Sequence, residues 1–430
     1  MATARTLAEW LEFVERQHPA SVALGLDRVD AVRRRLDLGF ACTIITVGGT
    51  NGKGSTCAML DAILRAAGYR VGLYLSPHVV RYNERVRISG EDASDAALCE
   101  AFTAVEQARG EVPLTYFEFG TLAAAWLIRR AQPEVVVLEV GLGGRLDAVN
   151  LFDADCAVLT AIDLDHMDFL GATREAIGYE KAGILRPGRP AVVGDPDPPA
   201  SVIAHAATIG ARVLQLGRDF GFAAAPAHWR YWGPEGRRAG LAYPTLRGAV
   251  QLANAATALC ALDMLRDRLP VTMQAVRHGL ARVRLPGRFQ SVPGRPSIIL
   301  DVAHNPQAAA VLARNLGAAG YAPETIGVIG MLADKDLVGV VAALTNRVTR
   351  WHVAALPGPR GASAAQLEDA LRRAAVTGPV RVHANPVDAF IAARDTASDD
   401  DRIVVFGSFL TVGEIAAHLE TTRRRSSIDG

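Results

Sequence analysis

Cysteine, aromatic residues and net charge are all scarce in this chain. Its 430 residues include 5 cysteines, 6% aromatic residues and a formal net charge of +1. A chain without a domain-wide positive field is a poor candidate for binding nucleic acid. The cysteines are scattered, odd in number and free of CxxC pairs, so we expect reduced thiols in a cytoplasmic protein.

Membrane-spanning and export signals are also missing. No apolar run approaches the length of a transmembrane helix, and the first 17 residues carry Glu9, Glu12 and Glu15 in an amphipathic pattern. We therefore expect neither a membrane span nor a signal peptide. No internal repeat stands out. Half of the residues are hydrophobic and 21% are charged, which is the balance of a globular enzyme.

Short apolar runs rich in β-branched residues alternate with helical patterns. The first five runs are Thr43–Val47, Val71–Leu75, Val135–Val140, Ala157–Ala161 and Ala191–Val193. After a break at Leu285-Pro-Gly287 the pattern restarts with Ile298–Asp301, Thr325–Gly330, Arg350–Ala354 and Ile403–Phe406. Such alternation predicts parallel strands joined by crossover helices. We predict two α/β domains, residues 1–285 and a smaller 286–430, hinged near residue 286, with a disordered tail over 421–430.

The segment Thr46-Val-Gly-Gly-Thr-Asn-Gly-Lys-Gly-Ser-Thr56 lies between a predicted strand and a predicted helix. A glycine-rich turn in this position wraps backbone N–H groups around phosphate oxygens, and Lys53 adds a charge for the terminal phosphates. Gly54 stands where the strict phosphate-loop pattern has Ser or Thr. The alternative is a strand–helix turn that binds no ligand. Lys53 and the surrounding pattern favour a nucleotide.

Carboxylates follow two of the predicted strands. Glu139 ends an otherwise apolar run, and a buried carboxylate needs a cation or hydrogen-bond donors nearby. At the carboxyl end of a parallel strand it would face a nucleotide, which predicts a magnesium ligand; the alternative is a surface carboxylate on a loop. The loop Asp163-Leu-Asp-His-Met-Asp168 suits a divalent metal or proton transfer, although acidic loops are commonly just solvated.

Three further segments carry polar groups whose spacing alone is not specific. The loop Leu75–Arg87 holds Ser76, a possible oxygen ligand, and three arginines that either bind anions or are solvated. Lys181 lies in Tyr179-Glu-Lys-Ala-Gly-Ile184, and a lone helical lysine usually faces solvent. In the second domain, Asp301-Val-Ala-His-Asn-Pro306 and Phe406-Gly-Ser-Phe409 each follow a strand.

Taken together, these segments resemble the folylpolyglutamate synthase/dihydrofolate synthase family of the Mur ligase superfamily. The matching segments, in order, are GTNGKGS (49–55), SPHVVRYNERVRI (76–88), YFEFGTLAA (116–124), LEVGLGGRLDAVN (138–150), DHMDFLG (165–171), EKAGIL (180–185), NAATAL (254–259), LPGRFQ (285–290), DVAHNP (301–306), GMLADKD (330–336) and FGSF (406–409). They span nearly the whole chain. The resemblance implies a P-loop NTPase-like central domain with a mostly parallel sheet and a smaller Rossmann-like C-terminal domain.

The resemblance also implies roles for individual residues. The ATP phosphates would be held by Asn51, Gly52, Lys53, Gly54 and Ser55, and the rest of ATP by Asn254, Arg288 and Asp301. Magnesium would be held by Ser76, Glu139 and His166. The pteroate group would be bound by Gly25, Leu26, Asp27, Arg28, Thr115, Tyr116, Phe117, Leu146, Asp147 and Ala148. The expected catalytic residues are Lys53, Lys181 and His304, with Lys181 carried as a carbamate that serves as an anionic ligand in the metal site.

The implied reaction is an ATP-dependent amide ligation. The γ-phosphoryl group passes to a substrate carboxylate, and the amine of L-glutamate then attacks the acyl phosphate, releasing ADP and phosphate. The expected cofactors are ATP and Mg²⁺, with a monovalent cation as a further candidate. The expected partners are dihydropteroate, tetrahydrofolates and L-glutamate, without nucleic acid or membrane, and we expect a monomer.

Two departures from the family pattern leave other functions open. Ala23 stands where the family usually has an acidic residue, and Leu410 stands where bifunctional members typically have histidine. A paralogous Mur-type ligase that joins another carboxylate and amine is therefore one alternative. A non-catalytic nucleotide-binding module is the other, but it predicts loss of the metal ligands, and Ser76, Glu139 and His166 are all present.

Overall fold

The chain forms two compact units. The computed structural model describes residues 5–18, 22–248 and 250–428. Unit 1 comprises Met1–His78, Tyr82–Thr245 and Gln251–Arg284, and unit 2 comprises Val79–Arg81, Leu246–Val250 and Leu285–Gly430. The predicted α/β class is confirmed in both units.

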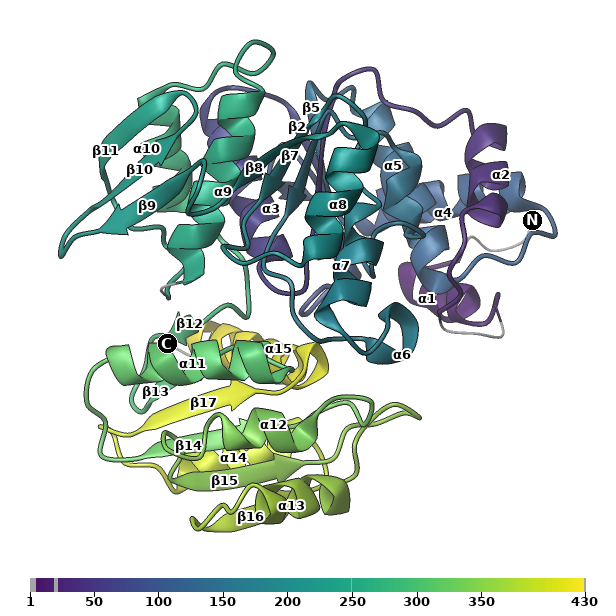
Figure 1. Ribbon diagram of the computed structural model, residues 1–430. Coiled ribbons are helices and arrows are strands. Elements are labelled where there is room, and N and C mark those ends of the chain that lie inside the picture. Colours follow the sequence, from purple (N-terminus) through teal and green to yellow (C-terminus); the bar gives the residue numbers. More distant parts are fainter. Residues whose placement is uncertain (1–4, 19–21, 249, 429–430) are drawn as a thin grey trace. The chain divides into compact units, whose positions relative to one another are not determined.

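Unit 1 is built on an eight-stranded, mostly parallel sheet in the order β4-β3-β2-β5-β1-β6-β7-β8 (Figure 1). Its strands are β1 (Thr43–Gly48), β2 (Val71–Tyr74), β3 (Val86–Ile88), β4 (Glu91–Asp92), β5 (Val135–Glu139), β6 (Cys156–Leu159), β7 (Pro190–Val193) and β8 (Arg212–Gln215). The central strands are buried along their length because helices cover both faces of the sheet. This burial explains why their sequences are continuous apolar runs.

Helices cover this sheet on both sides. The helical elements of unit 1 are α1 (Leu7–Glu15), α2 (Asp27–Arg35), α3 (Lys53–Ala66), η1 (Tyr82–Arg85), α4 (Asp95–Arg109), α5 (Tyr116–Arg130), η2 (Ala148–Leu151), α6 (Met167–Leu170), α7 (Arg174–Ala182), α8 (Ala200–Ile209), α9 (Val250–Met264) and α10 (Met273–Arg282). Helices α3, α9 and α10 lie on one side of the sheet, and α5, α7 and α8 lie on the other (Figure 1). The apolar faces of α4, α5, α7 and α8 share one core with alternate residues of β5.

Unit 1 also contains a small antiparallel sheet that the sequence pattern did not predict. It consists of β9 (Gly221–Ala224), β10 (Trp229–Gly233) and β11 (Gly236–Leu241). Trp229 and Tyr231 are buried, and the hydroxyl of Tyr231 donates to Asp263 Oδ2 of α9 at 2.6 Å. These contacts anchor the small sheet to the helical layer.

Unit 2 has a six-stranded sheet in the order β12-β13-β17-β14-β15-β16. Its strands are β12 (Gln290–Val292), β13 (Ser297–Leu300), β14 (Thr325–Ile329), β15 (Arg350–Ala354), β16 (Val380–His383) and β17 (Arg402–Phe406). Its helices are α11 (Pro306–Ala318), α12 (Leu337–Ala342), α13 (Ala364–Arg373), α14 (Pro386–Asp395) and α15 (Phe409–Ile428). Alternate residues of β17 pack into two cores, one under α11–α13 and one under α14 and α15.

The end of the chain differs from the expectation of disorder over residues 421–430. Helix α15 continues to Ile428, while residues 429 and 430 lie outside the described part of the chain. Val412 and Ile415 bury its first turns in the core of unit 2. Once a helix is nucleated in this way, each added residue gains a hydrogen bond at little cost, so the polar turns can follow.

Candidate active site

The phosphate loop of unit 1 joins β1 to α3 and depends on two glycines. Gly49 has φ of 142°, and a Cβ atom there would lie 1.9 Å from Thr160 Oγ1. Gly52 has φ of 95° and caps α3, and a Cβ atom there would lie 2.6 Å from Asn254 Oδ1. Both backbone conformations favour glycine over residues that carry a Cβ atom. The same contact places Asn254, expected to hold ATP, directly against the phosphate loop.

Two lysine head groups converge on this loop. Lys53 Nζ donates to the carbonyl oxygens of Gly49 at 3.1 Å and Thr50 at 3.2 Å, and Lys181 Nζ donates to the Gly49 oxygen at 2.9 Å. Lys181 is only 4% exposed, so it is not a solvent-facing helical lysine. Burial, reinforced by the neighbouring positive charge of Lys53, lowers the pKa of Lys181 to about 7. Both head groups therefore lie against the backbone carbonyl oxygens of the glycine-rich loop.

Neighbouring residues fix the loop to the rest of the sheet. Asn51 forms an isolated β-bridge with Ala161. The Thr50 hydroxyl donates to the Asp163 carbonyl oxygen at 2.9 Å and accepts from the Asp163 backbone nitrogen at 3.0 Å. Gly54 and Ser55 are buried in the first turn of α3. The loop after β6 is therefore held beside the phosphate loop, as expected for adjacent parallel strands.

Glu139 ends β5, next to the phosphate loop. Strand β5 lies between β1 and β2, and Glu139 is level with Val47 of β1. The carboxylate is 4% exposed, and its Oε2 accepts a hydrogen bond from the Ser76 backbone nitrogen at 2.9 Å. The alternative of a surface carboxylate on a loop is thereby excluded. Ser76 itself follows β2, so the two predicted metal ligands lie on neighbouring strands.

His166 lies after β6, the strand on the other side of β1. His166 is the N-cap residue of α6 and has a left-handed backbone conformation, with φ of 52°. Its backbone nitrogen donates to Asp165 Oδ1 at 2.8 Å. Within the described residues, no group of three or more His, Cys, Asp and Glu side chains forms a closed metal site. Magnesium characteristically binds through one or two carboxylates together with phosphate oxygens and waters. A carboxylate and a hydroxyl beside the phosphate loop fit that ion.

The candidate pteroate-binding segments of unit 1 are tied together by a buried ion pair. Arg28 contacts the Glu118 carboxylate twice, at 3.0 Å through Nε and 2.8 Å through Nη2, and it also donates to the Ala23 carbonyl. Glu118 additionally accepts from the Thr115 backbone nitrogen at 2.8 Å, completing a capping box at the start of α5. The structure thus brings the segment 25–28, which leads into α2, onto the residues 115–117 that begin α5.

Asp147 has a structural role that the sequence did not reveal. Its two carboxylate oxygens accept backbone hydrogen bonds from Leu142 at 2.8 Å and Val149 at 2.9 Å. Burial raises the pKa of Asp147 to about 6, although these backbone donors oppose the shift. The carboxylate therefore shapes the glycine-rich loop 141–144, with Leu146 and Ala148 on either side of it. Phe117 packs on this loop, because a Cβ at Gly141 would lie 2.4 Å from its ring.

In unit 2, the predicted residues gather where β13 and β17 end. Asp301 follows β13, and its oxygens accept from the backbone nitrogens of Phe289 and Ala303, both at 2.9 Å. Burial raises the pKa of Asp301, and the nearby Arg288 opposes that shift. The Arg288 guanidinium lies 5.2 Å from the ring of Phe409, and the His304 ring lies 6.0 Å from the same ring.

The sequence did not indicate that the ring of Phe409 lies beside both Arg288 and His304. Phe409 lies in the FGSF segment, whose small residues were the only signal in the sequence. Gly407 has φ of 105°, and a Cβ there would lie 2.6 Å from the Gly330 carbonyl oxygen. This turn brings the end of β17 beside the end of β14.

Comparison with known proteins identifies the family. The family signature "Mur ligase middle domain" matches residues 47–262, and "Mur ligase, glutamate ligase domain" matches residues 287–409. The chain is 45% identical to the dihydrofolate synthase/folylpolyglutamate synthase of Escherichia coli (strain K12) over 421 residues, which cover 98% of this chain and 97% of the relative. This chain belongs to the dihydrofolate synthase/folylpolyglutamate synthase family of Mur ligases.

Solved structures of this family agree with the fold. The E. coli FolC structure in complex with DHPP and ADP has a TM-score of 0.92 and 44% identity, covering 98% of this chain and 99% of that one. A bifunctional folylpolyglutamate synthase/dihydrofolate synthase with Mn, AMPPNP and L-glutamate bound has a TM-score of 0.89 and 47% identity, covering 97% and 98%. The relatives therefore bind adenine nucleotides and a divalent metal.

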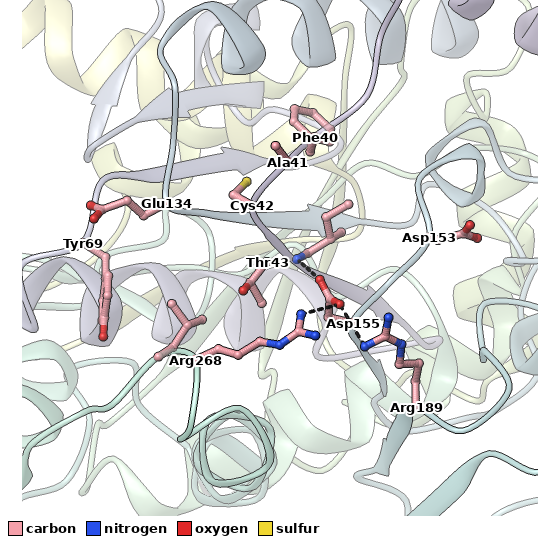
Figure 2. A pocket seen from close by; sticks show the side chains of 12 residues that line it. Phe40, Ala41, Cys42, Thr43, Tyr69, Glu134, Asp153, Asp155, Arg189 and Arg268 are labelled. Carbon is pink, nitrogen blue, oxygen red and sulfur yellow. Dashed lines mark hydrogen bonds and ion pairs between the residues drawn. The ribbon is translucent and has the colours of Figure 1, made fainter.

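A cavity of about 540 Å³ in this Mur ligase is lined by none of the predicted site residues; Figure 2 shows its lining. It is lined by residues that precede strands, including Thr43 at the start of β1 and Glu134 before β5. Arg189 and Arg268 both contact Asp155 Oδ1 there, at 3.3 and 2.7 Å. Ligands of parallel α/β sheets bind at the carboxyl ends of the strands. The phosphate loop is at that opposite edge, so the cavity is not the candidate active site.

Throughout the described ranges, no helix is long and apolar enough to cross a membrane. All five cysteines are free thiols.

Proposed function

We propose that this Mur ligase joins L-glutamate to dihydropteroate and to tetrahydrofolates, cleaving ATP to ADP and phosphate. The observation that carries the proposal is the convergence of Lys53 and Lys181 on the Gly49 carbonyl, beside the buried carboxylate of Glu139. Two cations facing a glycine-rich turn suit phosphate, and a nearby carboxylate suits the metal that accompanies it. Family membership supplies the choice of substrates.

The residues of the phosphate loop would act on the phosphoryl group. The backbone of Asn51–Ser55 would cradle the β- and γ-phosphates while Lys53 balances charge on the transferring group. A substrate carboxylate oxygen attacks the γ-phosphorus, the bond to ADP breaks, and an acyl phosphate forms. The glutamate amine then displaces phosphate to give the amide. Bound magnesium would neutralise phosphate charge, and we assign Ser76, Glu139 and His166 to hold it.

Lys181 has the properties of a lysine that is carbamylated. Only a neutral amine adds carbon dioxide, and burial beside Lys53 lowers the pKa of Lys181 to about 7, far below that of an ordinary lysine. The carbamate would convert a cation into an anion near the metal position. A monovalent cation is a further candidate ligand of that anionic site.

Roles for the remaining residues follow the same reasoning. In unit 1, Asn254 lies against Gly52 and is assigned to ATP, and the segments joined by Arg28 and Glu118 are assigned to the pteroate group. In unit 2, Arg288 and Asp301 are assigned to ATP and His304 to the reacting groups. Asp147 would act mainly through the loop that it shapes.

A paralogous ligase with another acceptor is the second candidate. Two positions favour it: Ala23 lacks the carboxylate that is usual in the family, and Leu410 is 48% exposed in the first turn of α15 where bifunctional members have histidine. Neither residue belongs to the phosphate loop. The difference therefore concerns the acceptor and not the ligation chemistry.

An assay of ADP release separates these candidates. Purified protein would be given ATP, Mg²⁺ and L-glutamate with dihydropteroate, with tetrahydrofolate, or with neither. The proposal predicts turnover with each folate substrate and little without one. ADP release with tetrahydrofolate but not with dihydropteroate would indicate a polyglutamate synthase only. No ADP release with either substrate would favour the paralogous ligase.

A further inference from the structure

Arg85 is a buried cation without a carboxylate partner. Three arginines follow β2 in the loop 75–87, and they differ in their surroundings. Arg81 is exposed, and Arg87 pairs with Asp92 at 2.8 Å. Arg85 is only 8% exposed, and no Asp or Glu of the described residues forms an ion pair with it. Burying a guanidinium without an anion is unfavourable, so this position calls for an explanation.

The groups around Arg85 satisfy only part of its guanidinium. Nε donates to His78 Nδ1 at 2.9 Å, and Cζ lies 5.1 Å from the ring centre of Tyr82 and 5.4 Å from that of Tyr116. Ring faces attract a cation but do not accept the in-plane hydrogen bonds of its terminal amino groups. His78 accepts through an unprotonated ring nitrogen, so it brings no negative charge. The two terminal amino groups remain available.

These amino groups are not sealed inside the protein. The fully enclosed polar side-chain atoms without a partner, in the part of the chain that the structure describes, are Thr46 Oγ1, Thr56 Oγ1 and Arg350 Nε. The terminal nitrogens of Arg85 are absent from that set, and they make no hydrogen bond to a described residue. They therefore keep some contact with solvent and have hydrogen bonds left to donate.

The position of Arg85 relates these amino groups to the substrates. Its carbonyl accepts from the Leu75 backbone nitrogen at 2.8 Å, one residue before Ser76, which contacts Glu139. On the other side, Tyr116 begins α5, where the pteroate group is assigned and where the helix dipole adds positive potential. Arg85 thus lies between the metal position and the pteroate-binding helix.

We propose that Arg85 binds the non-reacting carboxylate of a folate's glutamate tail, an inference that rests on the proposed function. Dihydropteroate has one carboxylate, and that group must react. A tetrahydrofolate has two carboxylates on its tail, separated by a short carbon chain, and only one of them reacts. A guanidinium beside the reacting position can bind the other through two parallel hydrogen bonds. Arg85 is then a specificity residue for glutamate extension rather than for dihydrofolate synthesis.

Substitution of Arg85 tests this assignment with both substrates side by side. Arg85→Met and Arg85→Lys would be assayed for kcat and KM with dihydropteroate and with tetrahydrofolate, at saturating ATP and glutamate. Loss of a charged, bidentate contact should raise KM for tetrahydrofolate by about tenfold to a hundredfold, while KM for dihydropteroate stays within about twofold. Arg87→Met, which removes a positive charge from the same loop, should leave the ratio of the two activities unchanged.

Equal losses with both substrates would overturn the proposal, because Arg85 would then serve the fold or the incoming glutamate. Unchanged kinetics would overturn it as well. If the variants do not fold, the wild-type protein can be tested with a tetrahydrofolate whose non-reacting tail carboxylate is replaced by a carboxamide. The KM for this analogue should rise by the same factor as in the Arg85 variants, and an unchanged KM would contradict the assignment. Failure of the wild-type protein with dihydropteroate would instead count against the proposed function.

Discussion

Single buried charges distinguish the candidate active site of this protein. Glu139 is an acid inside an apolar strand, and Lys181 is a base inside a packed helix. Glu139 was visible in the sequence as a charge that ends an apolar run, whereas spacing alone indicated that Lys181 faces solvent. The burial of Lys181 was not visible, because burial and the approach of a second charge depend on neighbours far away in the chain. The same limit hid the difference between Arg85 and Arg87, which are two residues apart.

Replacement of Glu139 should separate catalysis from folding. We expect Glu139→Ala to lower kcat by roughly a thousandfold or more, because the carboxylate assigned to the metal is lost. Stability should be retained, since a buried carboxylate is itself costly. Steady-state assays and thermal unfolding check the two parts. Near-normal turnover in this variant would contradict the metal assignment.

Carbamylation of Lys181 should depend on pH in a defined direction. With a pKa of about 7, the neutral amine, which is the reactive form, increases as pH rises from about 6 to about 8. An ordinary lysine would need a pH several units higher. Carbon-13 NMR of protein in labelled bicarbonate should therefore show a carbamate signal that grows over this range.

The variant Lys181→Ala provides the control, because it should lack the carbamate signal. Short added carboxylates should restore part of its activity by filling the anionic position. An unmodified ammonium group at Lys181 in a nucleotide-bound crystal structure would end this assignment.

The phosphate loop shows how elements constrain one another. Gly49→Ala brings a Cβ atom to 1.9 Å from Thr160 Oγ1, in addition to its unfavourable backbone conformation. Gly68→Ala is a matched control, because φ there is also positive, at 94°, but the space around it is open. We expect a loss of about 3 kcal/mol in unfolding free energy for Gly49→Ala and about 1 kcal/mol for Gly68→Ala, measured by denaturant unfolding. Equal losses would mean that Thr160 moves aside freely.

Elements were predictable where they are buried on both faces. The runs that became β5 and β14 are apolar over most of their length and fully buried, so their pattern needed no tertiary information. The strands that the pattern missed are short, partly exposed or at an edge, and polar residues weaken their signal; they are β3, β4, β8–β12 and β16. Helix α15 extends further than predicted because its first turns are anchored in a core that the polar tail does not reveal.

At the scale of the whole molecule, the contribution of unit 2 rests on Arg288, which is proposed to bind ATP. The phosphate loop belongs to unit 1, whereas Arg288 belongs to unit 2. We expect Arg288→Ala to raise KM for ATP about tenfold or more through loss of a charged contact, with little change in the unfolding of unit 1. An unchanged KM for ATP would contradict the assignment of Arg288 to ATP.

The order of the segments along the chain was sufficient to predict the family. Segments from residue 49 to residue 409 match it in sequence order, and the domain signatures over 47–262 and 287–409 agree. The choice of acceptor was less predictable, because it depends on side chains such as Ala23 and Leu410 whose effect arises from their surroundings.

The identity of the products tests the central claim most directly. Protein would be incubated with ATP, Mg²⁺, dihydropteroate and L-glutamate, and the nucleotides and folates would be separated and quantified. We predict ADP, phosphate and dihydrofolate in equal amounts, with no amide formed when glutamate is omitted. AMP and pyrophosphate as products, or ADP release that does not depend on a folate substrate, would contradict the account.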